Sequence, residues 1–121
     1  MARILIVDDS PTDVQNVRNI LQRAGHVVTE AGSAQDVLAR VKSERPDCVV
    51  MDVVMPGMNG FQATRVLSKD PETQKIPVIV VSTKNQETDR VWALRQGARE
   101  YIVKPVKPEE LINKINAVLG G

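Results

Sequence analysis

Three acidic residues stand out because each is associated with an aliphatic run. Asp8 and Asp9 come directly after residues 4–7, and Asp52 is the one acid within the apolar run 49–55. A buried carboxylate is costly unless it is paired, bound to a metal or placed at a strand end. Three carboxylates held together repel one another, so either one takes up a proton or a hard cation neutralises them. Mg²⁺ suits the second case, because it prefers oxygen ligands and combines one or two carboxylates with a phosphate.

Two further polar residues fit phosphoryl transfer at such a site. Ser82 follows the aliphatic run 76–81, and Lys104 follows the short run 101–103. With Mg²⁺ bound, the ammonium and the hydroxyl could each contact a phosphoryl oxygen, while an aspartate carboxylate acts as nucleophile and forms an acyl phosphate. Each residue also has an ordinary structural interpretation: Asp8 and Asp9 could cap a helix, and Lys104 could lie on the surface before a turn. Because all these polar residues follow strands, the chemical interpretation is favoured.

The elements that must position these residues are five strands alternating with five helices. The expected strands are 4–7, 26–31, 49–52, 76–81 and 101–103; the helices are expected after Ser10 and Ser33, which act as N-caps, and from residues 60, 86 and 108. Pro56 and Gly57 are expected to stop the third run. This alternation predicts an α/β fold, an open parallel sheet with helices on both faces. Ligands bind at the carboxyl ends of such strands, so the polar residues are expected to converge there.

Composition narrows the class of protein. The 121 residues suffice for one domain, and 16 Lys and Arg against 15 Asp and Glu leave no net field that would attract nucleic acid or anionic lipid. Cys48, the single cysteine, rules out an internal disulfide and is expected to be a buried thiol, with a redox sensor as the less favoured alternative. No apolar run approaches the roughly 20 residues of a membrane span, so we expect a cytoplasmic protein that does not insert into membranes.

An ordered set of motifs makes the whole chain resemble the receiver domain of two-component response regulators. The set is Asp8-Asp9, Asp52, Met55-Pro56-Gly57, Gly60, Ser82, Tyr101 and Lys104-Pro105. The resemblance implies a doubly wound, flavodoxin-like or CheY-like (βα)5 fold with strand order 2-1-3-4-5, as one receiver domain over residues 1–121. It also implies a cis peptide bond before Pro105.

The resemblance assigns a role to each residue of the site. It implies that Asp52 accepts a phosphoryl group from a histidine kinase in a reaction that depends on Mg²⁺. The metal ligands would be Asp9, Asp52 and the backbone carbonyl of Val54, with Asp8 helping directly or through water. Lys104 would contact the phosphoryl group. Beyond self-phosphorylation and slow self-dephosphorylation, the protein would not be an enzyme.

The resemblance also implies a switch next to the phosphoryl group. Ser82 aligns with the hydroxyl that moves toward the phosphate, although the neighbouring Thr83 leaves the register open. Tyr101 aligns with the aromatic residue that turns inward behind it. The signal would pass to the face made by the fourth helix, the fifth strand and the fifth helix. Trp92 either lies on this partner-facing surface or covers the sheet edge.

No DNA-binding segment follows the last expected helix, so the chain resembles stand-alone, chemotaxis-type receivers that act on a protein effector in trans. More narrowly, segments 60–65, 86–92 and 115–119 resemble the receivers that control twitching motility by type IV pili. This resemblance implies a chemotaxis-like sensor kinase as phosphoryl donor and the pilus motor machinery as a candidate effector.

Three other functions remain to be weighed against signal transmission. The protein could drain phosphate from a sister receiver, which the sequence leaves open. An aspartate-nucleophile phosphatase would use the same residue types, but such enzymes usually carry a cap domain for which this chain has no room. A flavodoxin-like FMN carrier needs a phosphate loop of hydroxyls and glycines, whereas the first loop here is acidic and aromatic residues are 2% of the chain.

Overall fold

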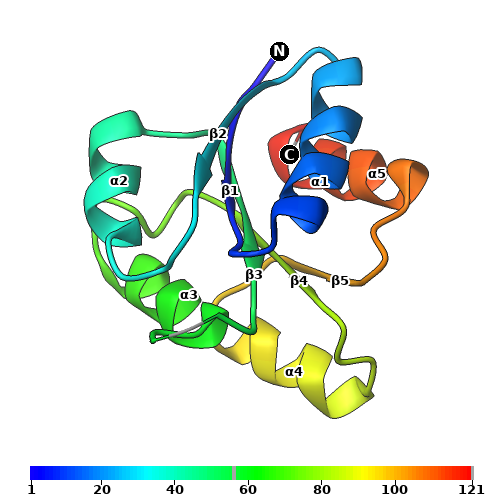
Figure 1. Cartoon of the computed structure of the whole chain (residues 1–121). Helices are drawn as coiled ribbons and strands as arrows, with labels where there is room; N and C mark the ends of the chain where they lie inside the picture. Colours follow the sequence, from blue (N-terminus) through cyan, green and yellow to red (C-terminus); the bar gives the residue numbers. More distant parts are fainter. Residues whose placement is uncertain (56, 121) are drawn as a thin grey trace.

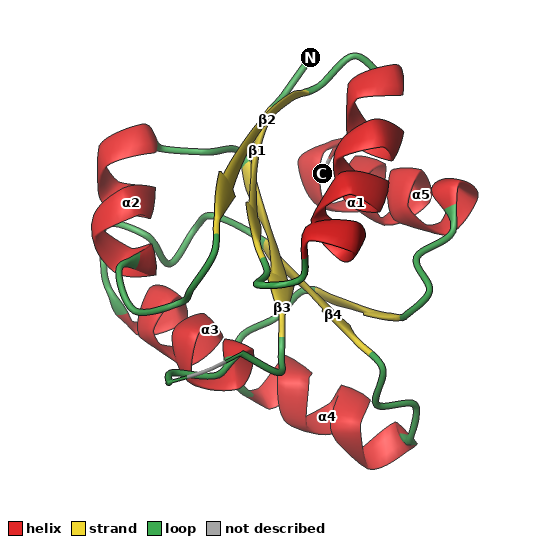
Figure 2. Cartoon of the chain, in the orientation of Figure 1, coloured by secondary structure: helices red, strands yellow, loops and turns green. Residues whose placement is uncertain are grey.

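Across residues 1–55 and 57–120, which the computed structural model describes, five strands alternate with five helices as expected. Figures 1 and 2 show their arrangement. In chain order the elements are β1 (Arg3–Val7), α1 (Pro11–Arg23), β2 (Val27–Ala31), α2 (Val37–Glu44), β3 (Cys48–Asp52), α3 (Gly60–Lys69), β4 (Val78–Ser82), α4 (Glu87–Arg95), β5 (Glu100–Val103) and α5 (Pro108–Gly120). The expected turn at Pro56 lies outside the described residues.

The strands form one parallel sheet in the order β2-β1-β3-β4-β5, which confirms the predicted doubly wound topology. β1 and β3 are direct neighbours, with Val7 opposite Met51. β3 in turn pairs with β4 so that Asp52 lies opposite Val81. This register brings the ends of β1, β3 and β4 to the same edge of the sheet.

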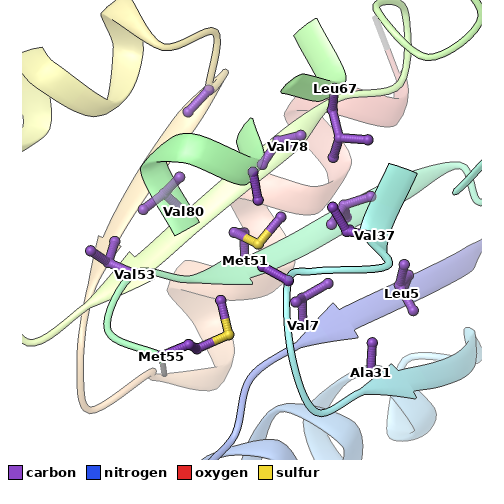
Figure 3. Close-up of a cluster of buried hydrophobic side chains, with 14 of the residues drawn as sticks. Leu5, Val7, Ala31, Val37, Met51, Val53, Met55, Leu67, Val78 and Val80 are labelled. Atoms are coloured by element: carbon purple, nitrogen blue, oxygen red, sulfur yellow. The ribbon is translucent and has the colours of Figure 1, made fainter. Parts of the chain in front are cut away.

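Two apolar layers hold the sheet between its helices. β1 alternates between them: Leu5 and Val7 face the cluster that includes residues of α2, α3 and α4, and Ile4 and Ile6 face the cluster beneath α1 and α5. Figure 1 shows α1 and α5 together on one side of the sheet. Figure 3 shows the first cluster, where Met51 of β3 lies among the aliphatic side chains of neighbouring elements. The tightly packed central strands, buried apart from Arg3, therefore fix the polar residues at their ends.

The second helix begins later than the sequence predicted. Ser33 was expected to be its N-cap, but the helix starts at Val37, and the cap position is Asp36, whose side chain makes no capping hydrogen bond. Ala34 is fully buried and its carbonyl accepts a hydrogen bond from the Val37 amide at 3.2 Å. Burial of Ala34 against the sheet thus favours a turn over residues 34–37 before the helix. The predicted capping by Ser33 is wrong.

Cys48 is a buried thiol, as expected from its place in an apolar strand. Cys48 is fully buried in β3, and this burial raises the pKa of its thiol to about 12. A thiol of this kind is inert at neutral pH, which disfavours the redox-sensor alternative. Among the described residues, the helices are too short or too polar to cross a membrane.

Candidate functional site

The ends of β1 and β3 bring the three predicted carboxylates together. Asp8 follows β1 and Asp52 is the last residue of β3, so the pairing of these neighbouring strands places the two side by side. One carboxylate oxygen each from Asp8, Asp9 and Asp52 lies within 4.8 Å of the others. Asp8 and Asp52 are buried and Asp9 is exposed. The predicted convergence of these acids is therefore present in the structure.

The backbone after β1 holds Asp8 in place and assigns helix capping to another residue. The Asp8 amide donates to the carbonyl of Ala31 at 3.1 Å, and its Oδ1 accepts from the amide of Ser10 at 2.9 Å. Ser10 is the N-cap of α1, and its hydroxyl accepts from the amide of Asp13 at 3.4 Å. Ser10 therefore caps the helix as predicted. The Oδ2 atom of Asp8 is not needed for capping and is available to the other groups of the site.

Lys104 enters the same site from the end of β5. Its Nζ lies 3.1 Å from Asp8 Oδ2, 2.9 Å from Asp52 Oδ1 and 2.8 Å from Asp13 Oδ2. The side chains of Lys104, Asp8 and Asp52 are 10%, 3% and 7% exposed. The ammonium is thus a buried counter-charge, and its interpretation as an ordinary surface lysine is wrong.

Asp13 also belongs to this site, although its position in the sequence does not indicate a role there. It lies in the first turn of α1, where an acid is explained by the helix dipole alone. Its spacing from Ser10 and Pro11 shows that it is in that turn, but nothing near it in the sequence indicates a lysine 91 residues away.

The electrostatics of the site favour an added positive charge. Burial and the negative charge of Asp8 raise the pKa of Asp52, although Lys104 acts in the opposite direction. Burial disfavours the ammonium of Lys104, but hydrogen bonds with Asp13, Asp52 and Asp8 outweigh it and raise the pKa of the lysine. Three carboxylates, those of Asp8, Asp13 and Asp52, therefore surround one ammonium that stays charged. A hard divalent cation with oxygen ligands fits the remaining negative charge of Asp8, Asp9 and Asp52.

The predicted switch residues, Ser82 at the end of β4 and Tyr101 in β5, are linked through the backbone of Lys84. Ser82 is buried and its Oγ accepts from the amide of Lys84 at 3.1 Å. The carbonyl of Lys84 accepts from the Tyr101 hydroxyl at 2.8 Å. Tyr101 is already buried in this structure, whereas Thr83 is exposed. Residues 82, 84 and 101 thus form a connected chain of hydrogen bonds.

The backbone around the site places the remaining predicted residues. A Cβ atom at Gly60 would lie 1.9 Å from the carbonyl oxygen of Asp52, so only glycine allows α3 to begin this close to β3. The Gly60 amide donates to the carbonyl of Val53 at 2.9 Å. The side chain of Val54 is exposed next to these residues. The peptide bond between Lys104 and Pro105 is cis, as predicted.

The chain belongs to the response regulator receiver domain family, whose sequence profile matches residues 4–116. Receiver domains take part in two-component signalling with a histidine kinase as partner, and they bind Mg²⁺ at an acidic pocket. Within this family, the chain is 59% identical over 121 residues to the protein PilH of Pseudomonas aeruginosa, with all of both chains covered.

Solved structures support the same assignment. The chemotaxis protein CheY4 of Vibrio cholerae has a TM-score of 0.90 and 32% identity, over 98% of this chain and 99% of that one. The receiver domain of the sensor histidine kinase PA1611 of Pseudomonas aeruginosa has a TM-score of 0.91 and 26% identity, over 99% of this chain and 98% of that one. In that structure a magnesium ion is coordinated in the active site cleft.

Proposed function

We propose that this receiver accepts a phosphoryl group on Asp52 from a histidine kinase, with Mg²⁺ held by Asp8, Asp9, Asp52 and the backbone carbonyl of Val54. The observation that carries the proposal is the position of Lys104, whose Nζ lies 2.9 Å from Asp52 Oδ1 inside the cluster of carboxylates. A carboxylate nucleophile next to a fixed ammonium and a cation site is the arrangement that phosphoryl transfer requires.

The proposed reaction uses the rigidity of the sheet. Bound Mg²⁺ would neutralise the acids and the charge on the phosphoryl oxygens. An oxygen of Asp52, fixed at the end of β3, attacks phosphorus, so a P–O bond forms as the P–N bond to the kinase histidine breaks and the imidazole leaves with the electron pair. Lys104 pairs with a phosphoryl oxygen as this happens, because its ammonium already lies beside the nucleophile.

Incubation of the protein with acetyl phosphate and Mg²⁺ tests this proposal without requiring the kinase. We expect intact mass spectrometry to show a gain of one phosphoryl group, about 80 Da, which is lost when EDTA replaces Mg²⁺. No gain in the presence of Mg²⁺ would contradict the proposal.

The switch is proposed to begin at Ser82. A phosphoryl group on Asp52 adds negative charge and strong acceptors, so it attracts the Ser82 hydroxyl. That movement would break the hydrogen bond from the Lys84 amide, and the carbonyl of the same residue accepts the bond from Tyr101. The signal then reaches α4 and β5. Because Tyr101 is already buried, we propose that it transmits this change rather than turning inward from solvent.

Ser82→Ala is expected to uncouple phosphorylation from the change at α4, whereas Thr83→Ala is expected to leave it intact. Ser82 is buried in the hydrogen-bonded chain, and its exposed neighbour is the matched control. Trp92, the single tryptophan, is half exposed on α4 and reports this change through its fluorescence. The two variants are compared at equal phosphoryl content, measured by mass. Loss of most of the fluorescence change in Thr83→Ala instead would assign the switch to Thr83.

A role in type IV pilus control is proposed from the 59% identity with PilH. We propose a chemotaxis-like sensor kinase as donor and a protein effector in trans, with the pilus motor machinery as candidate. Transfer of labelled phosphoryl groups from that kinase to this protein, measured against an unrelated histidine kinase, checks the donor. If labelled phosphate drains from a sister receiver while this protein binds no effector, the protein is a phosphate sink.

A further inference from the structure

One face of α1 holds the segment that carries Lys104. The Oδ2 atom of Asp13 lies 2.8 Å from Lys104 Nζ. One turn further along the helix, the side-chain amide of Asn16 donates to the carbonyl of Val106 at 3.2 Å. Residues three apart lie on the same face of a helix, so Asp13 and Asn16 together bind the segment 104–106 to α1. The position of the ammonium is therefore set by α1 as well as by β5.

The contacts of Lys104 conflict with the proposed metal site. Its ammonium contacts Asp8 and Asp52, whose carboxylates also belong to the cluster that could hold a cation. Asp13 contacts the same ammonium but does not belong to that cluster among the described residues. Its side chain is 42% exposed, so its charge stays solvated and needs no second partner. The ion pair between Asp13 and Lys104 can therefore persist when Asp8 and Asp52 bind a metal ion instead of the lysine.

We propose that Asp13 is a positioning residue: it holds the Lys104 ammonium beside the first turn of α1 and thereby leaves Asp8 and Asp52 free to bind Mg²⁺. The inference rests on the proposed function, because it assumes the metal site described above. Without Asp13, the ammonium would rely on Asp8 and Asp52 alone and would compete directly with the cation. Asp13 would thus strengthen metal binding without touching the metal.

Titration calorimetry with Mg²⁺ alone, at fixed ionic strength and without phosphoryl donor, tests this role. We expect Asp13→Asn to weaken Mg²⁺ binding roughly 2- to 5-fold, the range expected for a partly exposed ion pair, and Asp13→Glu to restore most of it. Loss of any nearby negative charge weakens cation binding to some extent, so the experiment needs a control of equal charge and exposure.

Glu30→Gln is the matched control. Glu30 lines the same hollow as Asp8 and Asp9, its side chain is 40% exposed, and it pairs with Arg18 instead of Lys104. We expect a clearly smaller loss of Mg²⁺ affinity than in Asp13→Asn. Equal losses in the two variants would show an effect of charge alone and overturn the inference.

A second variant tests whether Asp13 acts through Lys104. In a Lys104→Met background, we expect Asp13→Asn to change the Mg²⁺ affinity no more than Glu30→Gln does. A full effect in that background would overturn the inference. If the wild-type protein binds Mg²⁺ and Asp13→Asn binds it equally well, this inference alone fails. If the wild-type protein binds no Mg²⁺, the metal site of the proposed function fails and this inference fails with it.

Discussion

Asp52→Asn is expected to abolish the incorporation of a phosphoryl group from acetyl phosphate. The amide has no nucleophilic carboxylate oxygen, yet it keeps the shape of the side chain and can still accept a hydrogen bond from Lys104. Intact mass after incubation with acetyl phosphate and Mg²⁺ measures the result. The matched control is Asp47→Asn, which removes an acid that accepts a bond from the Arg3 amide at 2.8 Å, just before β3 begins. A mass gain in Asp52→Asn would show that another residue is the acceptor.

The same variant is expected to be more stable than the wild type at neutral pH in the absence of Mg²⁺. Burial and the charge of Asp8 raise the pKa of Asp52, so the folded state binds this proton more readily than the unfolded state does. The corresponding stability is present below the ordinary pKa of an aspartate and is lost as pH rises through the raised value. Urea unfolding should therefore separate the two proteins at pH 7 and bring them together in acid. Mg²⁺ should stabilise the wild type more than the variant.

The sequence was sufficient to predict the sheet and most of the site because both follow from strand ends. Each aliphatic run marked a buried parallel strand, and the polar residue after it marked the edge where ligands bind. Asp8, Asp52 and Lys104 lie at the ends of three different strands, yet their convergence follows from this single rule. The motifs of the receiver family then selected one strand order among those that alternating elements allow.

Other features depend on contacts that local sequence does not contain. An acid in the first turn of a helix is expected for any helix, so the pairing of Asp13 with Lys104 is visible only once α1 and β5 are placed. The start of α2 is decided by the burial of Ala34 against the sheet rather than by the capping preference of Ser33. The link from Ser82 to Tyr101 runs through the backbone of Lys84, whose side-chain type carries no information about it.

Lys104→Met is expected to cause a large loss of stability in the metal-free protein at neutral pH. The methionine keeps much of the apolar stem but removes the charge that faces Asp8 and Asp52, whose side chains are 3% and 7% exposed. Removal of one partner from a buried ion pair costs about 3 kcal/mol, because the remaining charges stay buried without compensation. Urea unfolding at pH 7 measures this loss. It should shrink in acid, where the carboxylates are protonated, and Mg²⁺ should restore much of it by supplying positive charge.

Lys114→Met is the control that separates a buried charge from an ordinary surface pair. Lys114 lies 3.0 Å from Glu100, but the two side chains are 37% and 28% exposed, so the loss should stay below about 1 kcal/mol. Equal losses in the two variants would show that the ammonium of Lys104 does not neutralise the acids of the site. If Mg²⁺ does not reduce the stability loss of Lys104→Met, the lysine and the cation act at different places. The lysine would then stabilise the fold, and the cation would bind elsewhere. If Mg²⁺ restores the stability of Lys104→Met, the lysine and the metal neutralise the same carboxylates. Lys104 would then supply, in the metal-free protein, the positive charge that the cation supplies when it is bound.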